Sequence, residues 1–178
     1  MTNHTNPEPG HSEPDPAAIE LFIFDVDGVL TDGSINIDDN GCETKHFHVR
    51  DGFGFRLWLD AGLKIAIITG RSGEALKHRL RSLKIDENLV IQGSRNKSEA
   101  LDEIIKRTGI SESHIAYMGD DWPDLPAINR VGFPTCPHDA EPEVRQACCL
   151  VTSKPGGHGA AREAIAHILN AKGIYQPE

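Results

Sequence analysis

Short apolar runs alternate with helical patterns from residue 21 onward, and this alternation is the feature that most constrains the fold. The runs predict strands at 21–27, 64–70, 89–93, 114–121, 131–136 and 149–152. Between them, the spacing of apolar residues predicts helices at 53–62, 73–83, 96–109, 124–130 and 159–173. A strand, a crossover helix and a further strand are typical of a parallel sheet covered on both faces. The sequence therefore predicts an α/β domain with a doubly wound, mostly parallel, Rossmann-like sheet.

Residues 34–49 break this pattern. In "SINIDDNGCETKHFHV", apolar and polar residues alternate on both sides of an Asn-Gly dipeptide that favours a tight turn. The segment predicts a protruding β-hairpin, with Ile35 and Ile37 on one face of its first strand and Phe47 and Val49 on one face of the returning strand. A two-stranded ribbon is marginally stable alone, so we expect these faces to pack against the parent domain or a neighbouring subunit.

Length and charge limit the classes of partner. The 178 residues fit one domain, and the formal net charge is −9. A nucleic-acid partner would need a basic stripe on the protein, so we expect none. No apolar stretch reaches the length of a membrane span, so we expect no membrane partner either.

The ends of the chain and its cysteines complete the domain description. Residues 1–18 are rich in Pro, Glu, Asn and His and lack the apolar core of a secretory signal, which predicts a disordered tail. A single domain is expected at 19–178, with 153–178 as its C-terminal tail. The cysteines form no Cys-x-x-Cys motif, and we interpret them as buried thiols of a cytoplasmic protein: Cys42, Cys136, Cys148 and Cys149.

Residues that can carry chemistry stand at the ends of four predicted strands. They are five carboxylates, a hydroxyl and an ammonium: Asp25, Asp27, Asp120, Asp121, Asp124, Thr69 and Lys97. On a regular strand, Asp25 and Asp27 would point to the same side. Because the carboxyl ends of parallel strands meet at one edge of a sheet, we expect all seven side chains to share a crevice. Crowded carboxylates need a cation, and oxygen ligands select Mg²⁺, which usually brings a substrate phosphate.

These residues resemble the motifs of the haloacid dehalogenase superfamily of phosphatases. Its first motif is matched by "DVDGVLT", its strand-end Thr or Ser by Thr69, its lysine by Lys97 and its acidic motif by "GDDWPD". The resemblance covers roughly residues 20–172. It implies a phosphoric monoester hydrolase in which Thr69 and Lys97 take part in catalysis by holding the phosphate.

The resemblance also implies a role for each aspartate. Asp25 would be the nucleophile that forms an aspartyl phosphate, and Asp27 the general acid and base. The ligands of Mg²⁺ would be Asp25, the backbone carbonyl of Asp27, and Asp120. Asp121 and Asp124 would support the metal's waters and the lysine.

Many members of the superfamily carry a cap domain, and this sequence leaves no room for one. The stretches "NGCETKHFHVRDGFGFRLW", "IAIITGRS" and "SKPGGHGAAREA" are further similar to the 3-deoxy-D-manno-octulosonate 8-phosphate phosphatase family. That similarity implies a homotetramer of lipopolysaccharide biosynthesis, in which the hairpins at 34–49 assemble a central barrel. It implies a small phosphorylated sugar acid as substrate and a C-terminal tail that reaches a neighbour's active site.

Several residues near the predicted crevice are candidates for binding this substrate. A guanidinium binds a carboxylate through two hydrogen bonds, which suits a sugar acid. Beside Thr69 and Lys97, the candidates are Gly70, Arg71, Arg50, Asp51 and Arg79. For Arg50, a salt bridge within the hairpin is an alternative interpretation. For His46 and His48, which alternate on a hairpin face, the barrel lumen or solvent is the alternative to a metal site.

Three alternatives stay open. The motifs report on the phosphate rather than the sugar, so a nine-carbon sialic-type acid 9-phosphate or another small sugar phosphate also fits. A receiver domain of two-component signalling is doubly wound with clustered aspartates, although its phosphorylated Asp ends the third strand. A non-catalytic scaffold is the third alternative, against which the intact set Asp25, Asp27, Lys97 and Asp120 argues.

Overall fold

A six-stranded parallel sheet forms the centre of the computed structural model, which describes residues 14–175. The strand order is β5-β4-β1-β6-β7-β8, and every neighbouring pair is parallel. The strands are β1 (Leu21–Phe24), β4 (Lys64–Ile68), β5 (Val90–Ile91), β6 (Ile115–Met118), β7 (Phe133–Cys136) and β8 (Leu150–Val151). This order confirms the predicted doubly wound sheet and places β1 at its centre, between β4 and β6.

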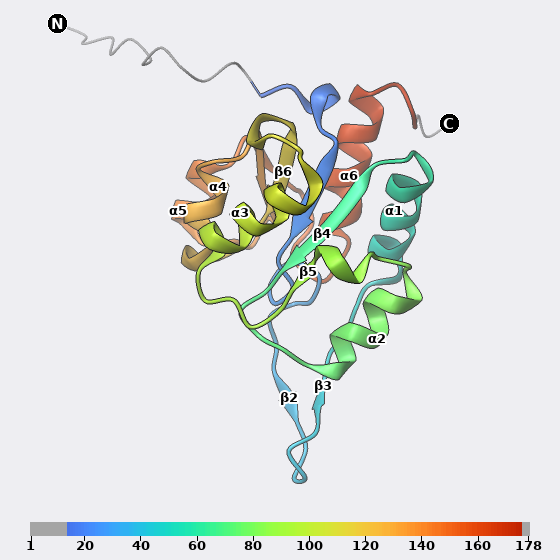
Figure 1. The fold of residues 1–178 in the computed structure, drawn as a ribbon. Helices are drawn as coiled ribbons and strands as arrows, with labels where there is room; N and C mark the ends of the chain where they lie inside the picture. Colours follow the sequence, from blue (N-terminus) through green and yellow to red (C-terminus); the bar gives the residue numbers. More distant parts are fainter. Residues whose placement is uncertain (1–13, 176–178) are drawn as a thin grey trace, which may run out of the picture.

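Helices cover both faces of the sheet (Figure 1). One face carries α1 (Val49–Asp60), α2 (Glu74–Ser82) and α6 (Ala160–Ala171); the other carries α3 (Lys97–Thr108), α4 (Leu125–Ile128) and α5 (Pro142–Ala147). Helix α5 has no counterpart among the predicted helices, because it has six residues and buries only Val144. Its Pro142 stands at the first helical position, where a missing N–H costs nothing.

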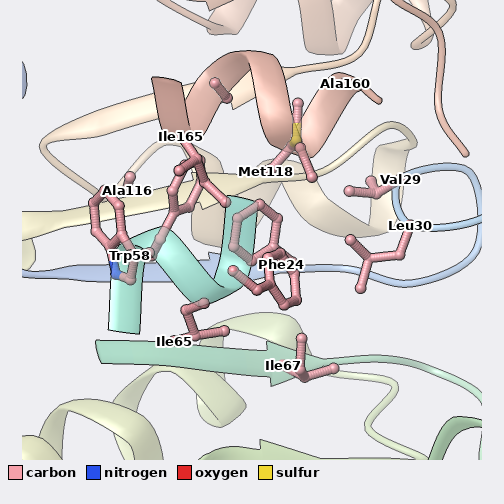
Figure 2. Close-up of a cluster of buried hydrophobic side chains, with 14 of the residues drawn as sticks. Phe24, Val29, Leu30, Trp58, Ile65, Ile67, Ala116, Met118, Ala160 and Ile165 are labelled. Atoms are coloured by element: carbon pink, nitrogen blue, oxygen red, sulfur yellow. The ribbon is translucent and has the colours of Figure 1, made fainter. Parts of the chain in front are cut away.

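The central strand is buried on both sides. Phe22 and Phe24 contribute to the cluster under α1 and α6, whereas Leu21 and Ile23 contribute to the cluster under α3. Figure 2 shows the first cluster, in which Phe24 lies among side chains of α1, α6 and the neighbouring strands. Burial of each large apolar side chain stabilises the fold by about 1.5–3 kcal/mol. Burial on both faces explains why β1 is apolar without alternation.

The predicted hairpin protrudes beyond the sheet as the ribbon of β2 (Asn36–Ile37) and β3 (Glu43–Thr44), which pair antiparallel (Figure 1). Its returning strand is shorter than predicted. Val49 begins α1 instead, because the ring of His48 accepts a hydrogen bond from the backbone N–H of Arg50 and caps the helix. Ile35 and Ile37 are 56% and 61% exposed in the single chain.

The first described residues already belong to the folded body. Pro16–Ala18 form a 3₁₀ turn, and the Ala17 carbonyl accepts a hydrogen bond from Lys172 Nζ just beyond α6. The rest of the predicted tail, residues 1–13, lies outside the described residues. Within residues 14–175, no helix combines the length and apolarity needed to cross a bilayer.

Candidate active site

The first two aspartates stand in a loop at the end of β1. The strand ends at Phe24, and the carbonyl of Val26 then accepts hydrogen bonds from the backbone N–H groups of residues 29–31. The predicted strand at 21–27 is therefore three residues too long, although Asp25 and Asp27 both line the same cleft. Because both residues lie in the loop rather than in the strand, the alternation of the strand does not set their side-chain directions, and each side chain is oriented by its own contacts.

Lys97, the first residue of α3, contacts aspartates of two loops, the one after β1 and the one after β6. Its Nζ lies 2.8 Å from Asp25 Oδ1 and 3.0 Å from Asp124 Oδ1, and it donates to the carbonyl of Ile68 at 2.8 Å. Its side chain is buried. Although burial disfavours the charged form, the two carboxylates raise the pKa of Lys97. The lysine is thus an ammonium in this site.

Asp124 is buried, and both of its oxygens have partners. The hydroxyl of Tyr117 donates to Oδ1 at 2.8 Å, beside Lys97. The backbone N–H groups of Asp120 and Asp121 donate to Oδ2 at 3.2 and 3.4 Å. Asp124 therefore orients the loop that follows β6. The exposed Asp121 instead caps the next turn, where it accepts from the N–H of Trp122 at 2.7 Å.

Three carboxylates converge with too little positive charge beside them. Asp25, Asp120 and Asp124 each offer an oxygen within 4.8 Å of the others. Burial, reinforced by Asp124, raises the pKa of Asp25 to about 6; burial, reinforced by Asp124 and Asp25, raises the pKa of Asp120 to about 8. Asp120 Oδ1 is buried and has no hydrogen-bond partner among the described residues. These residues fit a divalent cation with oxygen ligands.

A cleft of about 360 Å³ opens above these groups. All predicted metal and phosphate residues line it, together with Ser94 and Arg95. Thr69 is buried at the end of β4, and its Oγ1 accepts from the backbone N–H of Arg71 at 3.2 Å. The carboxyl edge of the sheet thus forms one site, as the sequence predicts.

Three predicted substrate residues lie outside the described lining of this cleft: Arg50, Asp51 and Arg79. The prediction for Asp51 is wrong, because its side chain is buried and accepts from the backbone N–H of Arg162 at the start of α6. Arg79 is half-buried and donates to the carbonyl of His48. Arg50 is exposed in the first turn of α1. Of the predicted sugar-binding arginines, the chain brings only Arg71 into its own cleft.

Two hairpin residues enter the site without having been predicted. Lys45 forms an ion pair with Asp27 and lies 3.2 Å from Glu43, and Glu43 lies 2.5 Å from Arg71. The alternation in "ETKHF" places Glu43 and Lys45 on one face of a strand. Nothing in that alternation says that this face turns toward the crevice, so the contact depends on tertiary structure.

Comparison with known proteins decides the family. Residues 89–163 match the family model of haloacid dehalogenase-like hydrolases. The chain is 40% identical over 155 residues to the 3-deoxy-D-manno-octulosonate 8-phosphate phosphatase of Escherichia coli K12. The aligned residues cover 87% of this chain and 81% of that protein. The chain belongs to the 3-deoxy-D-manno-octulosonate 8-phosphate phosphatase family.

Other members of the octulosonate phosphatase family agree. The Haemophilus influenzae protein is 41% identical, over 87% of this chain and 85% of that protein. The solved structure of the Moraxella catarrhalis phosphatase, in complex with a magnesium ion, a phosphate ion and KDO, has a TM-score of 0.86 and 41% identity, over 89% of this chain and 90% of that one. The predicted family and the predicted fold without a cap are confirmed: in this chain, only the hairpin separates β1 from α1.

Proposed function

We propose that this protein is a Mg²⁺-dependent phosphatase that hydrolyses 3-deoxy-D-manno-octulosonate 8-phosphate to the free sugar acid and phosphate. One observation carries the proposal: Asp25, Asp27, Thr69, Lys97 and Asp120 line a single cleft at the carboxyl edge of the sheet. The names of the curated relatives and the magnesium, phosphate and KDO of the Moraxella catarrhalis structure support the substrate and the cofactor.

The proposed ligands of Mg²⁺ are Asp25, the backbone carbonyl of Asp27, and Asp120. Asp120 Oδ1 has no hydrogen-bond partner among the described residues and is therefore free to bind the metal. Both oxygens of Asp124 are already hydrogen-bonded, to Lys97, Tyr117 and backbone N–H groups. When bound, the metal supplies positive charge that offsets the repulsion between the carboxylates and a phosphate.

The chain's own residues supply the covalent chemistry. A carboxylate oxygen of Asp25 forms a bond to phosphorus while the bond from phosphorus to the sugar oxygen breaks, and Asp27 donates a proton to that oxygen. Thr69 and Lys97 hold the phosphate oxygens. A water molecule then attacks the phosphorus of the aspartyl phosphate, Asp27 takes up its proton, and the bond to Asp25 breaks to release phosphate.

Phosphate release tests this function. The purified protein with Mg²⁺ is given the eight-carbon acid phosphate, a nine-carbon acid 9-phosphate and a hexose phosphate. Asp25→Asn is the blank, since its side chain has nearly the same shape but is a poor nucleophile. We expect selective release from the eight-carbon substrate and none from the variant. Preference for the nine-carbon acid would replace the substrate, and turnover by Asp25→Asn would refute the aspartyl phosphate.

We also propose that the enzyme is a homotetramer of the cytoplasm that serves lipopolysaccharide biosynthesis. The exposed Ile35 and Ile37 support an assembly through the hairpins. Free thiols suit a reducing compartment, and all four cysteines are free. The prediction that they are buried is wrong for Cys42 and Cys149, which are exposed. Arg50 and Arg79 stay proposed contacts of the sugar acid, beside Arg71 in the cleft.

A further inference from the structure

A chain of ion pairs ties the hairpin to both sides of the cleft. Lys45 Nζ contacts Asp27 Oδ1 and lies 3.2 Å from Glu43 Oε1, while Glu43 Oε2 lies 2.5 Å from Arg71 Nη2. Asp27 belongs to the loop after β1 and Arg71 to the loop after β4, whereas Glu43 and Lys45 belong to the hairpin. The protruding ribbon therefore meets the general acid of the proposed mechanism.

Lys45 is more buried than its place in an exposed ribbon suggests. Its side chain is 7% exposed, against 22% for Asp27 and 30% for Glu43. An ammonium that loses this much water needs carboxylate partners, so its position is fixed by the two acids. Among residues 14–175, the one side chain that hydrogen-bonds the carboxyl of Asp27 is Lys45. Since Asp27 lies beyond the end of β1, the pleat of the sheet does not set the direction of its side chain.

We propose that Lys45 is a positioning residue, which holds Asp27 Oδ1 so that Oδ2 is aimed at the leaving group. The hairpin is then part of the catalytic machinery. This inference rests on the proposed function.

The step that Lys45 serves is the transfer of the phosphoryl group to Asp25. The Asp25–phosphorus bond forms, the bond from phosphorus to the leaving oxygen breaks, and the electron pair stays on that oxygen. This oxygen takes the proton that a protonated Asp27 carries on Oδ2, while Oδ1 accepts the hydrogen bond of Lys45 and Glu43 remains the counter-ion of the ammonium. A leaving group that is stable as an anion does not need this proton. The contribution of Lys45 therefore depends on the leaving group, which distinguishes it from a purely structural role.

The test is Lys45→Met, which keeps much of the side chain's length and removes its charge. We compare kcat/KM for three substrates: the eight-carbon acid phosphate, glucose 6-phosphate, which has no carboxylate, and p-nitrophenyl phosphate, whose leaving group is a stable anion. This ratio covers the steps up to formation of the phospho-aspartate, so the later use of Asp27 as a base does not enter. General acid catalysis contributes ~10²–10⁴-fold, and we expect a loss of about 100-fold on both sugar phosphates and little change on the aryl phosphate.

Each other pattern overturns the inference. An equal loss on all three substrates would mean that Lys45 binds the phosphate or supports the fold, and a loss confined to the eight-carbon acid would mean that it binds the carboxylate. Lys45→Arg keeps the charge and should recover part of the lost activity on both sugar phosphates. Wild-type protein that hydrolyses none of the three would refute the proposed function itself, and this inference with it.

Two further variants guard against indirect effects. Lys77→Met removes an exposed lysine that pairs with Glu74 on α2, and it should leave all three values unchanged. Lys45→Gln is a second neutral variant, for which the same pattern is expected if the methionine disturbs folding. Thermal unfolding of each variant shows whether the fold is retained.

Discussion

At the scale of single residues, Asp120 links metal binding to pH. Burial and the neighbouring carboxylates raise its pKa from 3.8 to about 8, so in the metal-free protein it carries a proton at neutral pH. A raised carboxyl pKa stabilises the folded state below pH 3.8, and this stabilisation is lost as the pH rises to about 8. Mg²⁺ competes with that proton. We therefore expect the rise in Tm caused by Mg²⁺ to grow as the pH increases from about 6 to about 8.

Calorimetric unfolding with and without Mg²⁺ at several pH values measures this dependence. In Asp120→Asn the side chain does not titrate, so the increment should be small and should vary less with pH. A wild-type increment that is the same at pH 6 and pH 8 would contradict the assignment of Asp120 as a metal ligand.

The residues that sequence alone could place are those whose role is fixed by position in a motif. Asp25, Thr69, Lys97 and Asp120 each follow a strand, and a parallel sheet brings such positions to one edge whatever the details of packing. Asp51 was misplaced, because the same carboxylate can face a substrate or cap a helix, and only the docking of α6 decides which. Residue type predicts the chemistry available, whereas partners depend on tertiary contacts.

At the scale of elements, the loop after β1 and the loop after β6 touch at Gly28. Its φ is +86°, and a Cβ there would lie 1.9 Å from Asp120 Oδ2. We expect Gly28→Ala to displace Asp120 and to lower kcat/KM by about 100-fold, since a shift of about 1 Å in a catalytic group costs that much. Gly62→Ala is the matched control, because Gly62 has a φ of +77° with nothing within 4 Å. Gly62→Ala therefore introduces similar backbone strain without a steric clash, and this variant should retain activity.

Steady-state kinetics and a Mg²⁺ titration of both glycine variants distinguish the two effects. If Gly62→Ala and Gly28→Ala lost activity equally, strain rather than the contact with Asp120 would explain the loss. Full activity in Gly28→Ala would show that the loops separate without consequence.

Long elements with strong periodicity were predictable, and short ones were not. The twelve-residue α3 has a capping Asn96 and a left-handed Gly109 at its ends, both visible in the sequence. Helix α5 buries one residue, which leaves no periodic pattern to detect. The hairpin was predicted from its Asn-Gly turn, but its returning strand was drawn too long because His48 can continue a strand or cap a helix.

At the scale of the whole molecule, the fold followed from the alternation of strands and helices, because right-handed crossovers leave few ways to arrange such a chain. The same rules say nothing of assembly. The hairpin protrudes beyond the sheet, and within residues 14–175 no element covers Ile35 and Ile37 (Figure 1). Assembly therefore has to be measured.

Light scattering of the wild-type protein should give a mass close to four times the 19.5 kDa of the chain. Ile37→Asp places a charge on the apolar face of the hairpin, where burial would leave it without a partner, so we expect this variant to dissociate. Val151→Asp makes the same kind of change at an exposed residue of β8, 40% accessible, and should keep the wild-type mass. A wild-type monomer with full activity would refute the tetramer. Dissociated Ile37→Asp protein that has lost activity on sugar phosphates but not on aryl phosphates would show that recognition of the sugar depends on assembly.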